Sequence, residues 1–406
     1  MTNMADAIAR VALPLLAAKM TQSPSLISFV GVLITLPWLL AALPVGVLVD
    51  RVSRRTLMVV AEAIRLCAIA SLFAAVLLDA KSLPIVYVVA LAMGLAEVLA
   101  LTSGASIVPS AVPKARWEPA TARITAMEYL WKQFLGAPVG GFLVATGFVF
   151  AFGVSGIVYA IGMVLLTLLV GNFSPKPAGG AETRPRQPIR VEIREGLDFL
   201  WKNRLLRTMA LLIAVMAGCW SVWLALIPAY AAAPGPLGLS PRQYGLLLTC
   251  LGVGGIVGTL LVGRVNRLLG RRWSMFVDII GSFFLVAAPA VLPSVKGSAI
   301  PIACAAFVAG VGGTMWTVNA RVIMQTFVPD HLLGRFNAAY RLISWGTAPI
   351  AAAVGGLVAQ FVSYQVAFGV FAVLCALLVI PYLRVVTDKA LAAVDTPRSK
   401  TASAEG

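Results

Sequence analysis

Two long apolar runs, residues 26–49 and 57–78, are separated by only a few residues that are rich in arginine. A helix needs about 20 apolar residues to cross the hydrocarbon core of a bilayer, so each run is long enough to span. Cations in a short loop between two spans hold that loop on the cytoplasmic side. The pattern therefore predicts a membrane-spanning helical hairpin whose loop carries Arg51, Arg54 and Arg55 in the cytoplasm.

Similar runs fill most of the chain, which is 60% hydrophobic and 12% charged, against about 25% charge in soluble proteins. Only helices or closed barrels satisfy their backbone in lipid, and these runs do not alternate as barrel strands do. We predict an all-α membrane protein with about twelve spans, at 3–20, 26–49, 57–78, 84–107, 122–146, 148–171, 207–231, 243–263, 274–293, 299–325, 336–361 and 364–384. The first run is short for a span, which suggests a truncated first helix.

The two halves of the chain repeat each other. The loop that ends in Arg54-Arg55 returns 217 residues later, ending in Arg271-Arg272, and further matches recur at offsets of 216 and 212. Repeats of six spans create a central path between two bundles, which rock to alternate access to it. The predicted domains are a six-helix bundle over 1–171, a cytoplasmic linker with an amphipathic helix over 172–206, a second six-helix bundle over 207–384, and a polar cytoplasmic tail over 385–406.

Several classes of function are disfavoured by the charge and the composition. The net charge of +16 comes mostly from Lys and Arg in expected cytoplasmic loops, which is a topological pattern and argues against nucleic acid as a partner. One histidine and five scattered cysteines offer no metal spacing and no nucleophile–base pair, so we expect neither a metal site nor an enzyme. No glycine-rich stretch resembles a phosphate loop, so we expect a proton gradient, not a bound cofactor or ATP, as the energy source.

The loop motif Gly46-x-x-x-Asp50-Arg51-x-x-Arg54-Arg55 resembles the signature that the major facilitator superfamily carries after its second helix. The segments Leu36-Pro37-Trp38 and Arg194 to Trp201 are similar to the drug:proton antiporter branch that includes macrolide, tetracycline and enterobactin exporters. One departure is Ala137, where the antiporter motif in helix five has its first proline.

The resemblance implies a secondary transporter in the cell membrane but does not imply its substrate. We predict export of small amphipathic compounds or drugs by alternating access against proton flow. Its partners would be the lipid bilayer and a small-molecule substrate, and we expect it to work as a monomer. The alternative within transport is a dedicated siderophore or metabolite exporter. A non-transporting sensor or a membrane-embedded enzyme is a different class, and a sensor would be expected to carry a sizeable soluble output domain.

Charged side chains inside spans are costly and point to function. A buried carboxyl can load and release a proton near neutral pH, and the candidates for this role are Glu97, Glu128 and Asp6. The spacing of Asp6–Arg10 and of Glu128–Lys132 equally fits local pairs that only neutralise each other. The candidate charge partners or substrate contacts are Arg10, Lys132, Arg321 and Arg341, whereas Asp278 is assigned a structural role.

Two further groups of residues are assigned from the motifs. A carboxylate and cations in the basic loop can form a cytoplasmic gate, for which the candidates are Gly46, Asp50, Arg51, Arg54, Arg55, Glu62 and Arg65. The alternative is that the cations serve only to hold the loop on the cytoplasmic side of the membrane. Small residues let helix backbones approach closely, and the predicted packing positions are Gly136, Pro138, Gly140, Gly141, Pro349, Gly355 and Gly356.

Overall fold

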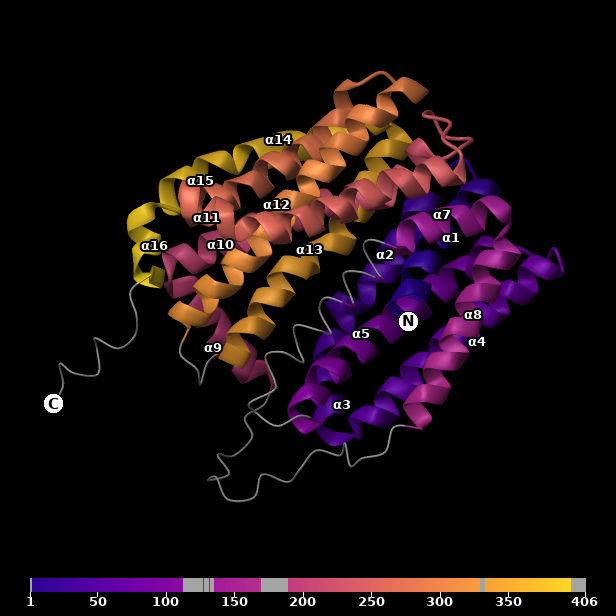
Figure 1. The fold of residues 1–406 in the computed structure, drawn as a ribbon, viewed down its shortest axis with the longest axis horizontal. Coiled ribbons are helices and arrows are strands. Elements are labelled where there is room, and N and C mark those ends of the chain that lie inside the picture. The colour runs from indigo at the N-terminus through magenta and orange to yellow at the C-terminus, as the bar shows by residue number, and fades with distance from the viewer. Residues whose placement is uncertain are drawn as a thin grey trace.

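The computed structural model describes residues 2–111, 135–168, 189–328 and 333–395, together with positions 127 and 131. Within these ranges the regular elements are helices, and the one extended pairing is an isolated bridge between Ala232 and Leu239. The helices of the first half are α1 (Thr2–Met20), α2 (Pro24–Leu40), α3 (Ala42–Arg51), α4 (Arg54–Leu77), α5 (Leu83–Ala111), α7 (Gly136–Thr146) and α8 (Phe148–Thr167). They gather in the indigo and magenta part of Figure 1.

The second half forms the part of Figure 1 whose colour runs from rose through orange to yellow. Its helices are α9 (Ile189–Lys202), α10 (Arg204–Ala231), α11 (Pro241–Val291), the short 3-10 helix η3 (Lys296–Ser298), α12 (Ala299–Phe327), α13 (Leu333–Phe361), α14 (Tyr364–Leu377), α15 (Val379–Val385) and α16 (Asp388–Asp395). Eight of the described helices are long and apolar enough to cross a membrane, and α2 and α7 are shorter apolar helices.

Glycine and capping residues divide the apolar runs into separate spans. Gly270 has a φ of 80° inside α11, a left-handed conformation that glycine adopts without strain, and it splits α11 into two spans. Gly147, with a φ of 150°, separates α7 from α8 at the predicted turn. Ser240 caps the start of α11 in a capping box with Gln243. With α11 counted as two spans and α2 joined to α3, the helices account for the predicted all-α fold.

The two halves touch along α2–α13 and along α7–α11. At Gly141 on α7, an added Cβ would lie 2.8 Å from the Cα of Gly245 on α11, so the two backbones are in contact. On the other side, the hydroxyl of Ser23 at the start of α2 donates to Gln360 on α13 at 2.6 Å. These contacts join α7 to the start of α11, and the start of α2 to the end of α13. The halves also meet further along α2 and α13, where the ring centroids of Trp38 and Trp345 are 6.2 Å apart.

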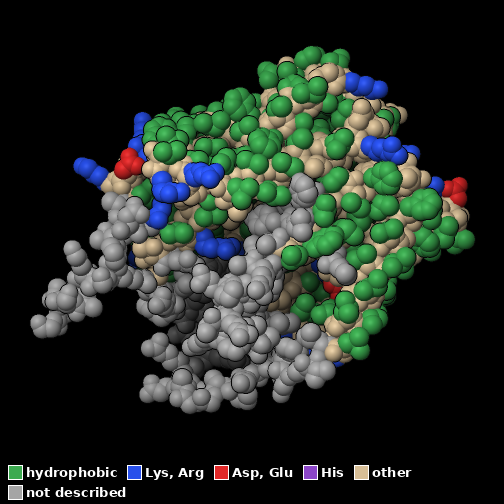
Figure 2. Space-filling view, in the orientation of Figure 1, with side chains coloured by type: hydrophobic (Ala, Val, Ile, Leu, Met, Phe, Trp, Pro, Cys, Tyr) green, Lys and Arg blue, Asp and Glu red, His purple; other side chains and the backbone are tan. Residues whose placement is uncertain are grey.

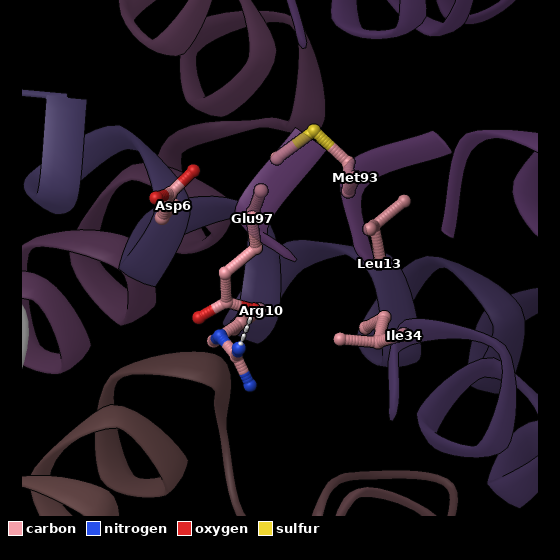
Figure 3. Close-up of a pocket in the computed structure, with 7 residues that line it drawn as sticks. Asp6, Arg10, Leu13, Ile34, Met93 and Glu97 are labelled. Atoms are coloured by element: carbon pink, nitrogen blue, oxygen red, sulfur yellow. Dashed lines mark hydrogen bonds and ion pairs between the residues drawn. The ribbon is translucent and has the colours of Figure 1, made fainter. Parts of the chain in front are cut away.

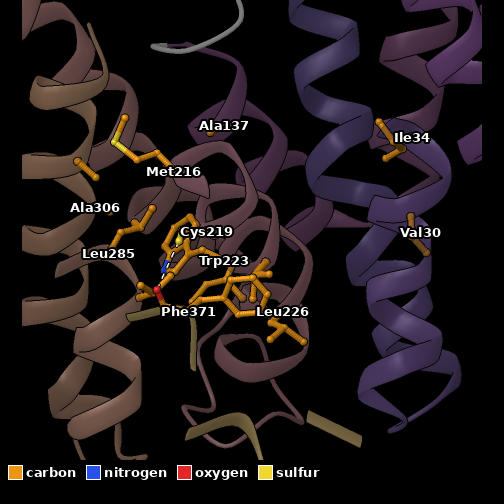
Figure 4. Close-up of a cluster of buried hydrophobic side chains, with 14 of the residues drawn as sticks. Val30, Ile34, Ala137, Met216, Cys219, Trp223, Leu226, Leu285, Ala306 and Phe371 are labelled. Atoms are coloured by element: carbon orange, nitrogen blue, oxygen red, sulfur yellow. Dashed lines mark hydrogen bonds between the residues drawn. The ribbon is translucent and has the colours of Figure 1, made fainter. Parts of the chain in front are cut away.

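The second half has a dense apolar core. Trp223 and Leu226 on α10 are fully buried, and α10 lies between helices of its own half and α2 of the first half (Figure 4). Large apolar side chains also cover the outer surface, where Val373 on α14 is 60% exposed. Hydrophobic side chains dominate the face drawn in Figure 2, as expected for a surface that meets lipid.

Helices α9 and α16 can be compared with what the sequence predicted for their segments. Helix α9 falls within the predicted amphipathic segment, with Leu200 fully buried and Asp198 exposed. The first part of the predicted polar tail, 385–406, contains a helix that the sequence analysis did not predict. Helix α16 forms there, and its Asp388 lies 3.5 Å from the guanidinium of Arg272. This ion pair and the buried Leu391 fasten α16 to the bundle.

Candidate functional site

Charged side chains from three helices meet inside the first half of the molecule. Helix α1 supplies an acid and a base one helical turn apart, α4 supplies a second such pair, and α5 supplies one acid. Tyr159 on α8 joins them from the side. These residues, which we call the charge cluster, are Asp6, Arg10, Glu62, Arg65, Glu97 and Tyr159.

Arg65 is the centre of the larger part of the charge cluster. Its Nη2 atom donates to Asp6 Oδ2 at 2.9 Å, and its Nη1 atom donates to Glu62 Oε1 at 2.8 Å. The phenol of Tyr159 donates to the other oxygen of Asp6 at 2.7 Å. All four side chains are buried, which strengthens each charged hydrogen bond because water does not screen it. One guanidinium thus serves two carboxylates.

Arg10 and Glu97 form the second part of the charge cluster, an ion pair between α1 and α5 (Figure 3). Glu97 is buried, whereas 39% of the Arg10 side chain is exposed. The pair borders a small cavity of about 10 Å³, space for about one water molecule. Asp6 also lines this cavity, together with apolar side chains that include Leu13, Ile34 and Met93. Arg10 is therefore the member of the cluster that is most open to its surroundings.

The described residues of the charge cluster do not balance each other's charge. They are three carboxylates and two guanidinium groups, so together they carry a net charge of −1 when every acid is ionised. Glu62 Oε2 is buried and makes no hydrogen bond among the residues that the structure describes. A buried charge without a full partner is costly. One added proton would make the whole cluster neutral.

Of the alternatives left open for Asp6 and Arg10, the structure does not show the local pair. Although the two residues share a face of α1, Asp6 turns to Arg65 on α4 and Arg10 turns to Glu97 on α5. Both pairs therefore connect different helices and do not merely neutralise one helix. Glu62 and Arg65 were also predicted to belong to the basic-loop gate. In the structure, Glu62 pairs with Arg65, and Arg65 pairs with Asp6 inside the bundle.

The remaining gate candidates are only partly within the described structure. The side chains of Asp50 and Arg51 lie outside the described residues, so the gate stays a prediction. Arg55 donates through Nε to the Leu166 carbonyl at 3.0 Å and through Nη2 to the Thr167 carbonyl, at the last turn of α8. A cation at a helix C-terminus satisfies free carbonyls and interacts well with the helix dipole. Arg55 therefore ties α4 to α8.

Other predicted residues fall elsewhere. Glu128 and Lys132 lie outside the described residues, and Arg321 and Arg341 are exposed on α12 and α13. Tyr159 was missed by the sequence analysis because a tyrosine inside an apolar run carries no charge signal. The described residues hold no group of three or more His, Cys, Asp or Glu that could bind a metal.

The glycines of the predicted packing motif lie at helix contacts. An added Cβ at Gly140 would lie 3.2 Å from the Cα of Ile8 on α1, and one at Gly136 would meet the Cβ of Ala7. Small residues therefore let α7 approach α1 on the side next to Asp6. In the second half, an added Cβ at Gly355 would lie 2.8 Å from Val222 on α10. The close approach of these helices depends on the missing side chains.

Membrane-spanning helices in two similar halves, packed around buried ion pairs, define a multi-pass membrane transporter with the major facilitator fold. The chain belongs to the transmembrane secretion effector family, whose sequence profile matches residues 1–402. The family match and the efflux proteins among its relatives make this chain an efflux transporter. The resemblance to the major facilitator superfamily is thereby confirmed.

The chain is similar to the multidrug efflux pump Tap of Mycolicibacterium fortuitum, with 24% identity over 371 residues that cover 89% of this chain and 88% of that protein. It is also similar to the enterobactin exporter EntS of Salmonella choleraesuis, with 26% identity over 322 residues that cover 77% of this chain and 72% of that protein.

Two solved structures have a similar fold. A bacterial homologue of the iron transporter ferroportin, in an inward-facing state, has a TM-score of 0.68 and 15% identity, covering 94% of this chain and 95% of that one. The nucleoside transporter NupG has a TM-score of 0.61 and 12% identity, covering 95% of this chain and 99% of that one. At this identity the likeness concerns the fold alone.

Proposed function

We propose that this transporter exports small amphipathic compounds in exchange for protons, and that the charge cluster carries the proton. The single observation behind the proposal is that, among the described residues, three buried carboxyls from three helices share two guanidinium groups. A low-dielectric interior favours the neutral state of such a group, so the cluster is suited to binding one proton.

The proton has two consequences for the helices. Protonation of Asp6 or Glu62 leaves Arg65 paired with the other acid alone. Protonation of Glu97 breaks its charge pairing with Arg10, which weakens the link between α1 and α5. Because these pairs join different helices, proton binding changes the relative stability of two packings of the bundle. A proton that binds one packing better than the other shifts the population toward it.

The packing of the two halves supports alternating access. The contacts at Gly141–Gly245 and at Ser23–Gln360 join the halves at one end. Rocking about the central path would open these contacts and close the opposite end. The basic loops would face the cytoplasm, and so would the linker and the C-terminus. In this proposal the protein works as a monomer in the cell membrane, without nucleic acid or a cofactor.

The substrate class rests on the relatives. A multidrug efflux pump among them favours a broad set of amphipathic compounds. Trp38 on α2 and Trp345 on α13 face each other across the two halves with ring centroids 6.2 Å apart, and such rings can stack on a flat apolar molecule. The second candidate is dedicated export of a siderophore, which the similarity to an enterobactin exporter favours.

The test is efflux of ethidium, a lipophilic cation, from cells that lack their own exporters. We expect wild-type protein to lower the retained dye, and a protonophore to remove this effect. Glu97→Gln and Asp6→Asn should each lower the efflux rate by about tenfold, the loss of about 1.4 kcal/mol of coupling.

Asp79→Asn is the matched control. Asp79 lies in the α4–α5 loop, where the hydrogen bond and the charge of Lys81 at 2.7 Å lower the pKa of its exposed carboxyl. Its replacement should leave efflux unchanged. Efflux that persists at the wild-type rate in both cluster variants, or in the presence of the protonophore, would contradict proton coupling through these acids. Export of enterobactin without export of ethidium would favour the second candidate.

A further inference from the structure

Among the described residues of the second half, one acid is buried, and it lies away from the charge cluster. This acid is Asp278, which is on the second span of α11 and is 2% exposed. The Ser282 hydroxyl donates a hydrogen bond to Asp278 Oδ1 at 3.3 Å. The Ser282 oxygen in turn accepts from Trp220 Nε1 on α10 at 2.9 Å. A chain of two hydrogen bonds thus leads from a half-buried indole to a fully buried carboxyl.

No cation pairs with Asp278 within the described part of the chain. On α12, an added Cβ at Gly312 would lie 2.5 Å from the Asp278 Cα, and Gly313 lies beside its Oδ1 atom. The backbones of α11 and α12 are therefore in contact here, which leaves no room for a long basic side chain. The titratable groups that face Asp278 from the other helices are Tyr340 on α13 and Cys375 on α14. Both are uncharged side chains at neutral pH.

The cations of this half are placed elsewhere. Arg271 and Arg272 precede Asp278 by about two helical turns, or roughly 10 Å of helix rise. Arg272 donates to the Leu383 carbonyl at 3.3 Å and pairs with Asp388. Arg321 on α12 and Arg341 on α13 are exposed.

The internal repeat in the sequence also shows a difference between the two halves in the residue that partners the buried acid. The offset of 217 residues that relates Arg54-Arg55 to Arg271-Arg272 also relates Arg65 to Ser282. Arg65 is the cation that pairs with Asp6 and Glu62 in the first half. In the second half Ser282 occupies that position, and its hydroxyl donates a hydrogen bond to Asp278. The same offset relates Asp278 to Ala61, so this acid is particular to the second half and has a hydroxyl where the first half has a guanidinium.

We infer that Asp278 is a second proton-binding site, which holds a proton in this conformation and exchanges it when α10 moves away from α11. A buried carboxylate with one hydroxyl partner lacks the charge and hydrogen bonds that would compensate for its desolvation, so the neutral acid is the stable form. Movement of α10 would withdraw Trp220, open the site to water and favour release of the proton. The link to transport rests on the proposed function, whereas the protonated acid can be tested alone.

The experiment is infrared difference spectroscopy on the purified full-length protein in lipid nanodiscs at about pH 7. The carbonyl stretch of a protonated carboxylic acid reports the neutral form directly. We expect a band from one acid that the wild type shows and that Asp278→Asn lacks. Asp79→Asn, the exposed carboxyl control, should leave the band in place. On transfer to D2O the band should shift, and its intensity should fall as the pH is raised toward about 10.

Identical wild-type and Asp278→Asn spectra in the acid region would overturn the inference, because Asp278 would then be ionised. A band that neither shifts in D2O nor responds to pH would also overturn it, because the acid would then be a permanent structural group. If Asp278→Asn fails to fold, wild-type and Asp6→Asn proteins labelled with carbonyl-¹³C aspartate take its place. Asp6 and Asp278 are the buried aspartates of the described residues, so a label-shifted band must then persist in Asp6→Asn.

Efflux of ethidium by the same preparations is measured separately. A wild type that does not export dye counts against the proposed function, whereas the spectra alone decide the state of Asp278.

Discussion

Asp6 on α1 and Arg65 on α4 form an ion pair of 2.9 Å in which both side chains are almost completely buried, 7% and 4% exposed. The pair connects two helices that are far apart in sequence, and Glu62 draws on the same guanidinium. Removal of one partner would leave the other charge in a medium that cannot solvate it. The stability of the first bundle and its proton binding therefore depend on the same residues.

Arg65→Met should be strongly destabilising, because it leaves both Asp6 and Glu62 without their cation. We expect a loss of about 3–5 kcal/mol in the free energy of unfolding, the usual cost of breaking a buried pair. Thermal unfolding in detergent would measure it. The triple variant Arg65→Met, Asp6→Asn, Glu62→Gln should recover most of the loss, because no unpaired buried charge remains where Arg65 stood. A single variant as stable as the wild type would show that this pair does not hold α1 to α4.

Exchange of the charges of Arg10 and Glu97 tests whether these residues act as a pair. Arg10→Glu and Glu97→Arg should each abolish dye efflux, because each places two like charges side by side at the cavity. The double variant should recover a measurable part of the efflux. Initial rates, normalised to the amount of protein in the membrane, would be compared. A double variant as inactive as the two singles would mean that the position of each charge matters more than the pairing.

Gly141→Ala should disturb the contact between the halves. The added methyl group would lie 2.8 Å from the Gly245 Cα, and backbone cannot move aside as a flexible side chain can. We expect the α7–α11 contact to open, which would raise the population of molecules that are open at this end. Distances between spin labels at the end of α7 and the start of α11 would report the change.

Gly369→Ala on α14 is the matched control for this substitution, because an added Cβ there meets no atom within 4 Å. Its label distances should match those of the unsubstituted protein. An unchanged distance distribution in Gly141→Ala would show that the contact between the halves tolerates the methyl group.

Arg55→Ala should affect stability more than transport. The side chain binds carbonyls at the end of α8, and loss of such hydrogen bonds costs about 1–3 kcal/mol. The melting temperature should therefore fall, while efflux per folded molecule stays near the wild-type value. Asp50→Asn, at the predicted gate, is the comparison and should lower efflux at unchanged stability. A drop in efflux per folded molecule for Arg55→Ala would assign that residue to the gate instead.

The positions of the helices follow from the sequence because lipid imposes a strict rule on length and polarity. The run at 207–231 corresponds to α10, Arg204–Ala231, and the turn before Phe148 is at Gly147 as predicted. The internal repeat likewise points to two similar halves. These features are local or periodic, so they can be deduced without knowledge of which helices touch.

The partners within the charge cluster could not be deduced in this way. Asp6 and Arg10 share a helix face, and their spacing is compatible with a local pair. Their actual partners, Arg65 and Glu97, are set by how α1, α4 and α5 pack, which depends on small residues such as Gly136 against Ala7. A buried charged side chain pairs with the opposite charge that lies within hydrogen-bond distance of it across the helix interface. Sequence spacing contains no information about that distance.

Proton flux is the most direct test of the central claim that the buried charge cluster couples proton movement to export. Purified protein would be reconstituted in liposomes with a pH-sensitive dye inside, and ethidium would be added under an imposed pH gradient. We predict that wild-type protein moves protons and ethidium in opposite directions at a fixed ratio, and that Asp6→Asn with Glu62→Gln and Glu97→Gln removes the proton flux. Ethidium transport by the wild type with no accompanying proton movement, or an unchanged proton flux in the triple variant, would contradict the account.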